Sequence, residues 1–225
     1  PTGRCMDDET RHVIADIAAR TRTTLVIDET MVNLWYDAPP PPPLAAYHRD
    51  APVIMLGSAG KSFWGGLRLG WVRAPSRTIA ALVQTRDTVD LGSPVIEQLA
   101  TTWLLDNADS FLPQRRQQLA ARRALCNTLM RKHFPEWRYQ QPQGGLSFWV
   151  ELPDTLATLF ATRAESVGIQ LGTGTRFGLA GAFDRFLRMP FALPEEPLRA
   201  AFNTLEPIWE TLRLQSGNAK VRKII

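Results

Sequence analysis

Two periodicities of apolar residues alternate along the chain, and they predict its secondary structure. Short apolar or alternating runs predict strands at residues 24–27, 52–56, 67–72, 146–152 and 186–191. Apolar residues at helical spacing predict helices over 6–20, 77–86, 94–107, 111–133, 156–167 and 197–214. In the first part of the chain, strands alternate with helices, which is typical of an α/β domain with parallel strands.

The pattern changes character near residue 95, where long helices replace the alternation. We therefore expect part of a large α/β sheet domain over residues 1–95, a small C-terminal α+β domain over 96–215 and a flexible tail over 216–225. A doubly wound sheet usually has more strands than the three predicted before the boundary. We expect the N-terminal half of the large domain to be absent from this chain.

Composition excludes several classes of protein. The hydrophobic fraction is 44% and the charged fraction 21%, as in ordinary globular proteins, and no apolar run approaches the roughly 20 residues that span a bilayer. The net charge of +4 is spread along the chain, so it does not indicate a nucleic-acid surface in these residues. Cys5 and Cys126 lack metal-ligand or redox spacing, and the three histidines are scattered, so we expect no metal site and a cytoplasmic location.

The segment "VIMLGSAGKSFWGGLRLGW" at 53–71 looks at first like a nucleotide-binding loop, because a strand leads into Gly60-Lys61-Ser62. That motif also needs a glycine five residues before Gly60, where this chain has Met55, and a helix directly after the serine. Gly65 and Gly66 would break such a helix. The segment is therefore predicted to be a strand, a loop that carries Lys61, and a returning strand.

Polar side chains follow the ends of these predicted strands. Asp28 ends one strand, Ser58 and Lys61 end the next, and Arg68 opens the strand that returns from the same loop. If the first two strands are parallel neighbours, all four side chains lie at one edge of the sheet. An amine, a carboxylate, a hydroxyl and a guanidinium together match the needs of pyridoxal phosphate, which requires a lysine partner, a charged partner for its ring nitrogen and phosphate ligands.

Four ordered motifs carry a specific resemblance: "DETM" at 28–31, "SAGKSFWGGLRLGW" at 58–71, "QGGLSFWVELP" at 143–153 and "RFLRMPFAL" at 185–193. They resemble the fold-type-I pyridoxal-phosphate enzymes, aminotransferase class I/II. The resemblance implies an α/β fold composed of the later part of the large sheet domain and the C-terminal small domain.

The same resemblance implies a role for each candidate residue. Lys61 would be the catalytic Schiff-base lysine, Asp28 the partner of the pyridinium nitrogen, and Ser58 and Arg68 phosphate ligands. Arg188 would hold the α-carboxylate of the substrate. Arg188 also fits this role on physical grounds, because an arginine among apolar strand residues is costly to bury without an anion.

Within this superfamily the chain is more similar to the aminotransferase-like effector domain of the MocR branch of GntR-type bacterial regulators, on motifs that include "GSPVIEQLA" at 92–100. This resemblance implies a domain that senses an amino acid or amine effector, a homodimer, and contact with DNA only through a winged-helix domain that is not in this chain. The alternative is a pyridoxal-phosphate-dependent aminotransferase that acts on an amino acid.

The chain departs from the family pattern in two ways. Met31 stands where these proteins usually have a tyrosine that hydrogen-bonds the cofactor, which favours sensing over catalysis. The family's asparagine, ring-stacking aromatic and glycine-rich phosphate loop would all precede Pro1. We therefore expect the isolated chain to bind the cofactor weakly. The intact Lys61, Asp28 and Arg188 favour the enzyme.

Overall fold

The computed structural model describes the backbone of residues 1–222 and the side chains of residues 1–216. The chain forms two compact units. The Lys61 unit contains residues 4–117 and 143–145, and the Arg188 unit contains residues 1–3, 118–142 and the chain from residue 146. The helix α5 (Ala108–His133) contributes to both units.

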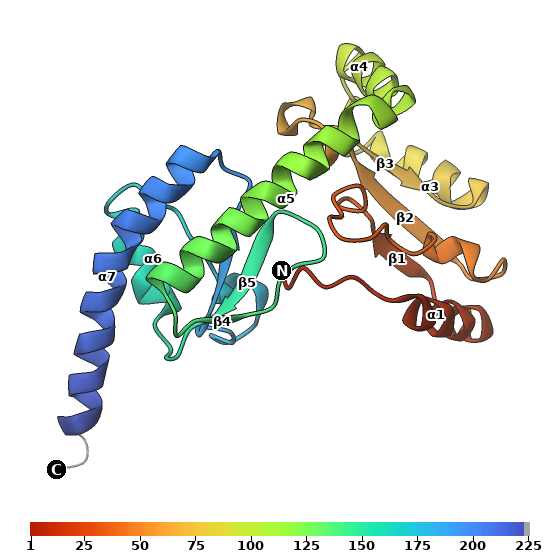
Figure 1. Cartoon of the computed structure of the whole chain (residues 1–225). Helices are drawn as coiled ribbons and strands as arrows, with labels where there is room; N and C mark the ends of the chain where they lie inside the picture. The colour runs from red at the N-terminus through yellow and green to blue at the C-terminus, as the bar shows by residue number, and fades with distance from the viewer. Residues whose placement is uncertain (223–225) are drawn as a thin grey trace. The chain divides into compact units, whose positions relative to one another are not determined.

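The Lys61 unit is built on a three-stranded sheet in the order β1-β2-β3 (Figure 1). Strand β1 (Leu25–Asp28) is parallel to β2 (Val53–Ser58), and β2 is antiparallel to β3 (Gly70–Arg73). The other elements of this unit are α1 (Asp8–Thr21), η1 (Leu44–Ala46), α2 (Ala59–Ser62), η2 (Gly65–Leu67), α3 (Ser76–Arg86), α4 (Val95–Asp106) and the first turns of α5.

Local sequence signals explain the first helix and its place on the sheet. Asp7 caps α1 by accepting a hydrogen bond from the Thr10 N–H at 2.8 Å, and acidic residues fill the first turn. Arg22 ends the helix in the left-handed conformation, with φ 55°. The helix buries Ala15 in a small core with three other residues, Leu44, Val53 and Met55.

The Arg188 unit has an antiparallel sheet in the order β4-β5-β7-β6. Its elements are the second part of α5, β4 (Arg138–Tyr139), β5 (Ser147–Glu151), α6 (Ala157–Glu165), β6 (Gly172–Thr173), η3 (Gly174–Phe177), β7 (Phe186–Pro190) and α7 (Glu195–Arg222). Aromatic residues dominate its core. The buried rings in contact with one another are those of Phe134, Trp137, Phe160, Phe202 and Trp209.

The predicted α/β class and the predicted major helices and strands are observed. The strands β4 and β6 were not predicted, because two residues are too few to show a period. Helix α7 continues beyond the expected residue 214 to Arg222. The flexible tail expected over 216–225 stays a prediction, since residues 223–225 lie outside the described residues.

The two compact units divide between residues 117 and 118, later than the change of pattern near residue 95. Aromatic contacts explain why α4 and the start of α5 belong to the Lys61 unit. Trp103 and Phe111 have ring centroids 5.5 Å apart, and the guanidinium carbon of Arg116 lies 4.3 Å from the ring centroid of Trp35. Within the described residues, no helix combines the length and hydrophobicity that crossing a membrane requires.

Candidate functional site

Lys61 lies on a single helical turn at the end of β2. The strand ends at Ser58, and the next four residues form α2, so the segment is a short helix and not the open loop expected from the sequence. The turn is tied down at its start, because the Ala59 N–H donates to the Leu69 carbonyl at 3.1 Å and the Phe63 N–H donates to the Ala59 carbonyl at 2.9 Å. Ala59 is buried while Lys61 is exposed, so the turn has a fixed base and an accessible amine.

Asn33 supports this turn from a distant part of the chain. Its Nδ2 donates a hydrogen bond to Ser62 Oγ at 3.1 Å, and Ser62 is only 2% exposed. Because a buried hydroxyl without a partner is costly, this bond restrains the residue that follows Lys61. Sequence reasoning missed Asn33, since nothing near it in the chain marks it as a partner of Ser62.

The antiparallel turn of β3 returns Arg68 to the end of the sheet that holds Ser58. Ser58 pairs with Gly70 in the ladder, and Arg68 lies two residues before that pair. Arg68 has φ 51°, in the left-handed region that residues with a Cβ rarely adopt. Such strain of about 1–3 kcal/mol often accompanies functional positions.

An open pocket of about 660 Å³ brings three of the predicted residues together. Ser58, Lys61 and Arg68 all line it, as does Trp71. The Trp71 indole lies across Gly57, where an added Cβ would be 2.1 Å from the ring. Glycine at position 57 is therefore required by the close approach of Trp71, whose place in the pocket was not predicted. The pocket is further lined by Thr30, Leu56, Gly60, Gly65, Leu69, Gly70, Val72, Ile79, Leu82, Val83 and Arg86.

Asp28 is held in its charged form near Lys61. The Thr30 hydroxyl and the Thr30 N–H, which lies 3.0 Å from Asp28 Oδ1, are the main causes that lower the pKa of the Asp28 carboxyl. Partial burial opposes this shift, and the positive charge of Lys61 adds to it. The charge of Lys61 is therefore close enough to stabilise the Asp28 carboxylate, and the roles predicted for the two residues stay predictions.

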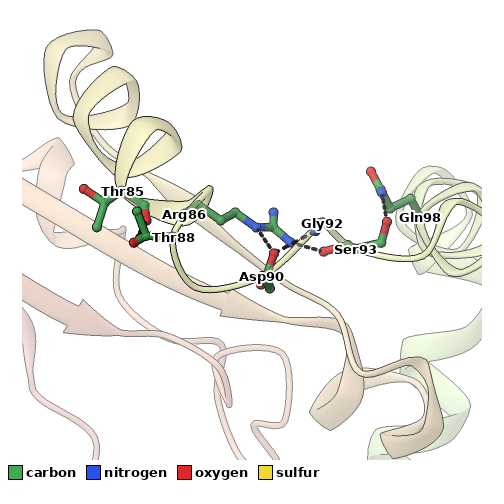
Figure 2. A network of polar contacts seen from close by, with 7 residues as sticks. All are labelled: Thr85, Arg86, Thr88, Asp90, Gly92, Ser93 and Gln98. Atoms are coloured by element: carbon green, nitrogen blue, oxygen red, sulfur yellow. Dashed lines mark hydrogen bonds and ion pairs between the residues drawn. The ribbon is translucent and has the colours of Figure 1, made fainter.

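Arg86 lines the same pocket but is already engaged, as Figure 2 shows. Its guanidinium donates to Asp90 Oδ1 at 2.8 Å and to Ser93 Oγ at 2.9 Å. Asp90 also accepts the Gly92 N–H, and the Ser93 carbonyl accepts the side-chain amide of Gln98. These contacts hold the connection between α3 and α4 and occupy Arg86.

Two residues that follow Asp28 in the chain differ in burial: Glu29 is largely buried, and Met31 is partly exposed. Glu29, which directly follows Asp28, is largely buried beside Arg11, with 3.7 Å between Glu29 Oε1 and Arg11 Nη1. Burial raises the pKa of Glu29, and the charges of Arg11 and Arg73 oppose that shift. Met31 is 37% exposed in the turn that follows Asp28.

Arg188 belongs to the other unit and lies on the exposed face of β7. Its neighbours Leu187 and Met189 are buried, whereas Arg188 is exposed. The expectation of a buried arginine was therefore wrong, because the period of a strand turns alternate side chains to opposite faces. Within the described residues Arg188 has no ion pair or hydrogen bond, so its guanidinium is available to an anion.

A comparison with family models matches residues 1–205 to aminotransferase class I and II. The chain belongs to this family. The resemblance inferred from the four motifs and the predicted fold class are both confirmed.

The chain is also similar to individual proteins and to a solved structure. The chain is 29% identical over 198 residues to "uncharacterized HTH-type transcriptional regulator YdfD" of Bacillus subtilis, covering 85% of this chain and 40% of that protein. It is 25% identical over 219 residues to "aromatic-amino-acid aminotransferase 1" of Thermococcus litoralis, covering 95% and 52%. It matches the structure of LysN, an α-aminoadipate aminotransferase of Thermus thermophilus complexed with N-(5'-phosphopyridoxyl)-L-leucine, with TM-score 0.88 and 25% identity over 96% of this chain and 57% of LysN.

The chain spans about half the length of these family members. Its pocket fits the phosphate of an aminotransferase cofactor, because three donors face one space without partners of their own. Among the described residues, the Lys61 amine, the Arg68 guanidinium and the Ser58 hydroxyl make no hydrogen bond, and neither cation has a carboxylate within 4.0 Å. Unpaired cations that share a pocket favour an anionic ligand.

Proposed function

We propose that the chain is the ligand-sensing, pyridoxal-phosphate-binding domain of a GntR/MocR-type transcription regulator. The observation that carries this proposal is the pocket in which Ser58, Lys61 and Arg68 have free donors while Asp28 stays charged beside Lys61. The similarity to an HTH-type regulator, of which this chain covers 40%, supports the regulatory part.

Each residue of the pocket has a separate task in this proposal. Arg68 and Ser58 bind the phosphate, Arg68 through a charge-assisted contact with two N–H groups. Lys61 attaches the cofactor through its amine, and Asn33 fixes the turn that presents it. Asp28 holds a proton on the ring nitrogen, which its lowered pKa allows across the neutral range.

Pyridoxal phosphate, when bound, supplies an aldehyde that reacts with amines and a ring that withdraws electrons. The protein contributes orientation and charge. Arg188 would bind a carboxylate of the amino acid or amine effector, since it is an unpaired arginine on an exposed strand face. The binding partners of the whole protein would be that effector, a second copy of the chain, and DNA through a winged-helix domain outside this chain, in the cytoplasm.

The alternative function is an aminotransferase that acts on an amino acid. The intact pair of Lys61 and Asp28 favours it, as does the similarity to an aminotransferase of Thermococcus litoralis. Met31 favours the sensor, because a thioether cannot donate the hydrogen bond that a tyrosine hydroxyl would give to a cofactor oxygen. The sensor therefore binds its ligand without efficient proton transfer.

Cofactor attachment is tested by chemical trapping. The chain is incubated with pyridoxal phosphate and treated with borohydride, which fixes a lysine adduct, and the modified peptide is located by mass spectrometry. We expect the adduct on Lys61, with loss in Lys61→Ala and retention in Lys132→Ala, which removes another exposed lysine. Equal labelling of the two variants would overturn the assignment.

Sensing and catalysis are separated by a turnover assay. Protein loaded with pyridoxal phosphate is mixed with a panel of amino acids and a keto acid, and the product is measured over time. The sensor forms at most about one product per site. Sustained turnover at the usual enzymatic rates of about 1–1,000 per second would establish the aminotransferase instead.

A further inference from the structure

Thr30 both lines the pocket and hydrogen-bonds the Asp28 carboxylate. Its N–H donates to Asp28 Oδ1 at 3.0 Å, and its hydroxyl makes a second hydrogen bond to the same carboxyl group. The pocket that Thr30 lines is the one that contains Lys61 and Arg68. No other residue that the structure describes donates a hydrogen bond to this carboxylate. Thr30 therefore connects the wall of the pocket to the charged group of Asp28.

Asp28 needs such a partner because it lies at the exposed end of a strand. It is the last residue of β1 and is itself exposed. The terminal torsion of an aspartate is broad, so an exposed carboxylate without a hydrogen bond takes many orientations. The charge of Lys61 attracts the carboxylate but makes no ion pair with it within 4.0 Å, so it does not fix one orientation. Two donors from a single neighbour restrict this rotation.

The turn that carries Thr30 is anchored on both sides. On one side, the Glu29 N–H donates to the Leu56 carbonyl at 2.9 Å. On the other side, Asn33 Nδ2 donates to Ser62 Oγ at 3.1 Å. Thr30 lies between these anchors and is half-buried. Its hydroxyl is therefore presented to the carboxylate from a restrained backbone.

Orientation, and not charge, is what the hydroxyl adds at neutral pH. The hydrogen bonds of Thr30 lower the pKa of Asp28 below its ordinary value of 3.8. An aspartate with the ordinary pKa is already almost completely charged at pH 7. Loss of the hydroxyl would therefore leave the charge of Asp28 unchanged at this pH and would free its carboxylate to rotate.

We propose that Thr30 is a positioning residue that holds the Asp28 carboxylate in one orientation for the protonated ring nitrogen of pyridoxal phosphate. Thr30 acts through Asp28. A carboxylate that is oriented before binding loses less conformational freedom when the ring binds, so the affinity is higher. This inference rests on the role proposed above for Asp28, and it adds the residue on which that role depends.

Two ligands isolate the contribution of the ring nitrogen: pyridoxal phosphate and deazapyridoxal phosphate, in which a C–H group replaces that nitrogen. Both have the aldehyde and the phosphate, so the contributions of Lys61, Ser58 and Arg68 largely cancel in the ratio of the two dissociation constants. The constants are measured at pH 7 by titrating the chain and following the absorbance of the ligand. We expect the wild-type chain to bind pyridoxal phosphate about tenfold more tightly than the deaza compound, since a hydrogen bond to a charged group contributes about that factor or more.

Three variants assign this preference to the Thr30 hydroxyl. Thr30→Val keeps the shape of the side chain and the backbone N–H but removes the hydroxyl, and it should reduce the preference about threefold or more. Thr30→Ser keeps a hydroxyl and should retain the preference. Thr24→Val is the matched control, because Thr24 is exposed and does not line the pocket, and it should leave the ratio within about twofold of the wild-type value.

A second measurement needs no cofactor. The carboxyl carbon of Asp28 is followed by carbon-13 NMR as the pH is lowered, in the wild-type chain and in the variants. Thr30→Val should raise the pKa of Asp28 toward its ordinary value, and Thr30→Ser and Thr24→Val should not. A role of Thr30 in packing alone would not move this pKa. Thr30→Ala serves in both tests if Thr30→Val does not fold.

The outcomes separate this inference from the proposed function. Equal affinity of the wild-type chain for the two ligands would overturn the role of Asp28 and, with it, that of Thr30. A wild-type preference that persists in Thr30→Val would overturn the role of Thr30 alone, and so would an equal loss of preference in Thr24→Val. An unchanged pKa of Asp28 in Thr30→Val would also overturn it, because the hydroxyl would then not be bonded to the carboxylate.

Discussion

Replacing Arg68 by glycine should stabilise the protein and weaken phosphate binding at the same time. Arg68 has φ 51°, a conformation that costs an L-residue roughly 1–2 kcal/mol and costs glycine almost nothing. Glycine also increases the entropy of the unfolded chain, which cancels about 0.4–1 kcal/mol of this gain in stability. The expected net gain is about 0.5–1 kcal/mol in the free energy of unfolding.

The same change removes the guanidinium from the pocket. A charge-assisted hydrogen bond contributes about 1.5–3 kcal/mol, and we expect the lower end because Arg68 is exposed. The affinity for pyridoxal phosphate should therefore fall about tenfold. The affinity for pyridoxal, which has no phosphate, should stay the same.

Urea unfolding and ligand titration measure the two effects separately. Arg22→Gly is the matched control, because Arg22 has φ 55° and does not line the pocket. It should stabilise the chain by a similar amount and leave both ligands unaffected. The reasoning is refuted if Arg68→Gly lowers stability while Arg22→Gly raises it, or if Arg68→Gly weakens pyridoxal and pyridoxal phosphate equally.

Three further predictions follow from single contacts. Asn33→Ala should lower the free energy of unfolding by about 1–2 kcal/mol, measured by urea titration, because it leaves the buried Ser62 hydroxyl without its partner. The pKa of Asp28 is lower in the folded chain than its unfolded value near 3.8, so its charged form adds stability above that value, and this stability is lost as the pH falls through the folded pKa. Asp28→Asn should therefore reduce the loss of unfolding free energy at acid pH. An unchanged dependence of the unfolding free energy on pH would contradict the shift. Burial raises the pKa of Cys126 to about 12, so a thiol reagent at pH 8 should modify the exposed Cys5 and leave Cys126 unmodified until the chain unfolds, as peptide mass analysis would show.

Short-range pattern was enough to locate most elements and the candidate pocket residues. Apolar runs and periods report which face of a strand or helix is buried, so the predicted β2 and α5 lie close to the observed ones. The motif around Lys61 also identified Ser58 and Arg68, because all three belong to one continuous segment. The family was recognisable for the same reason.

Tertiary structure decided what the motifs could not contain. The contact of Asn33 with Ser62 joins residues 29 positions apart, and the buried Glu29 is paired with Arg11 from helix α1. Arg188 is exposed because the sheet buries the opposite face of β7. The contact of Arg188 with Phe177 depends on the neighbouring elements β6 and η3.

The sequence by itself determined the family, the α/β class and the residue types at the ends of the strands, because these depend on local propensity, period and motif. Which side chains face one another depends on strand register and on the packing of distant segments. The antiparallel pairing of β3 with β2 returned Arg68 to the pocket of Lys61, and the left-handed backbone at Arg68 is held by that same turn. Such constraints arise only when the whole unit is folded, since many weak contacts must act together to hold a strained residue in place.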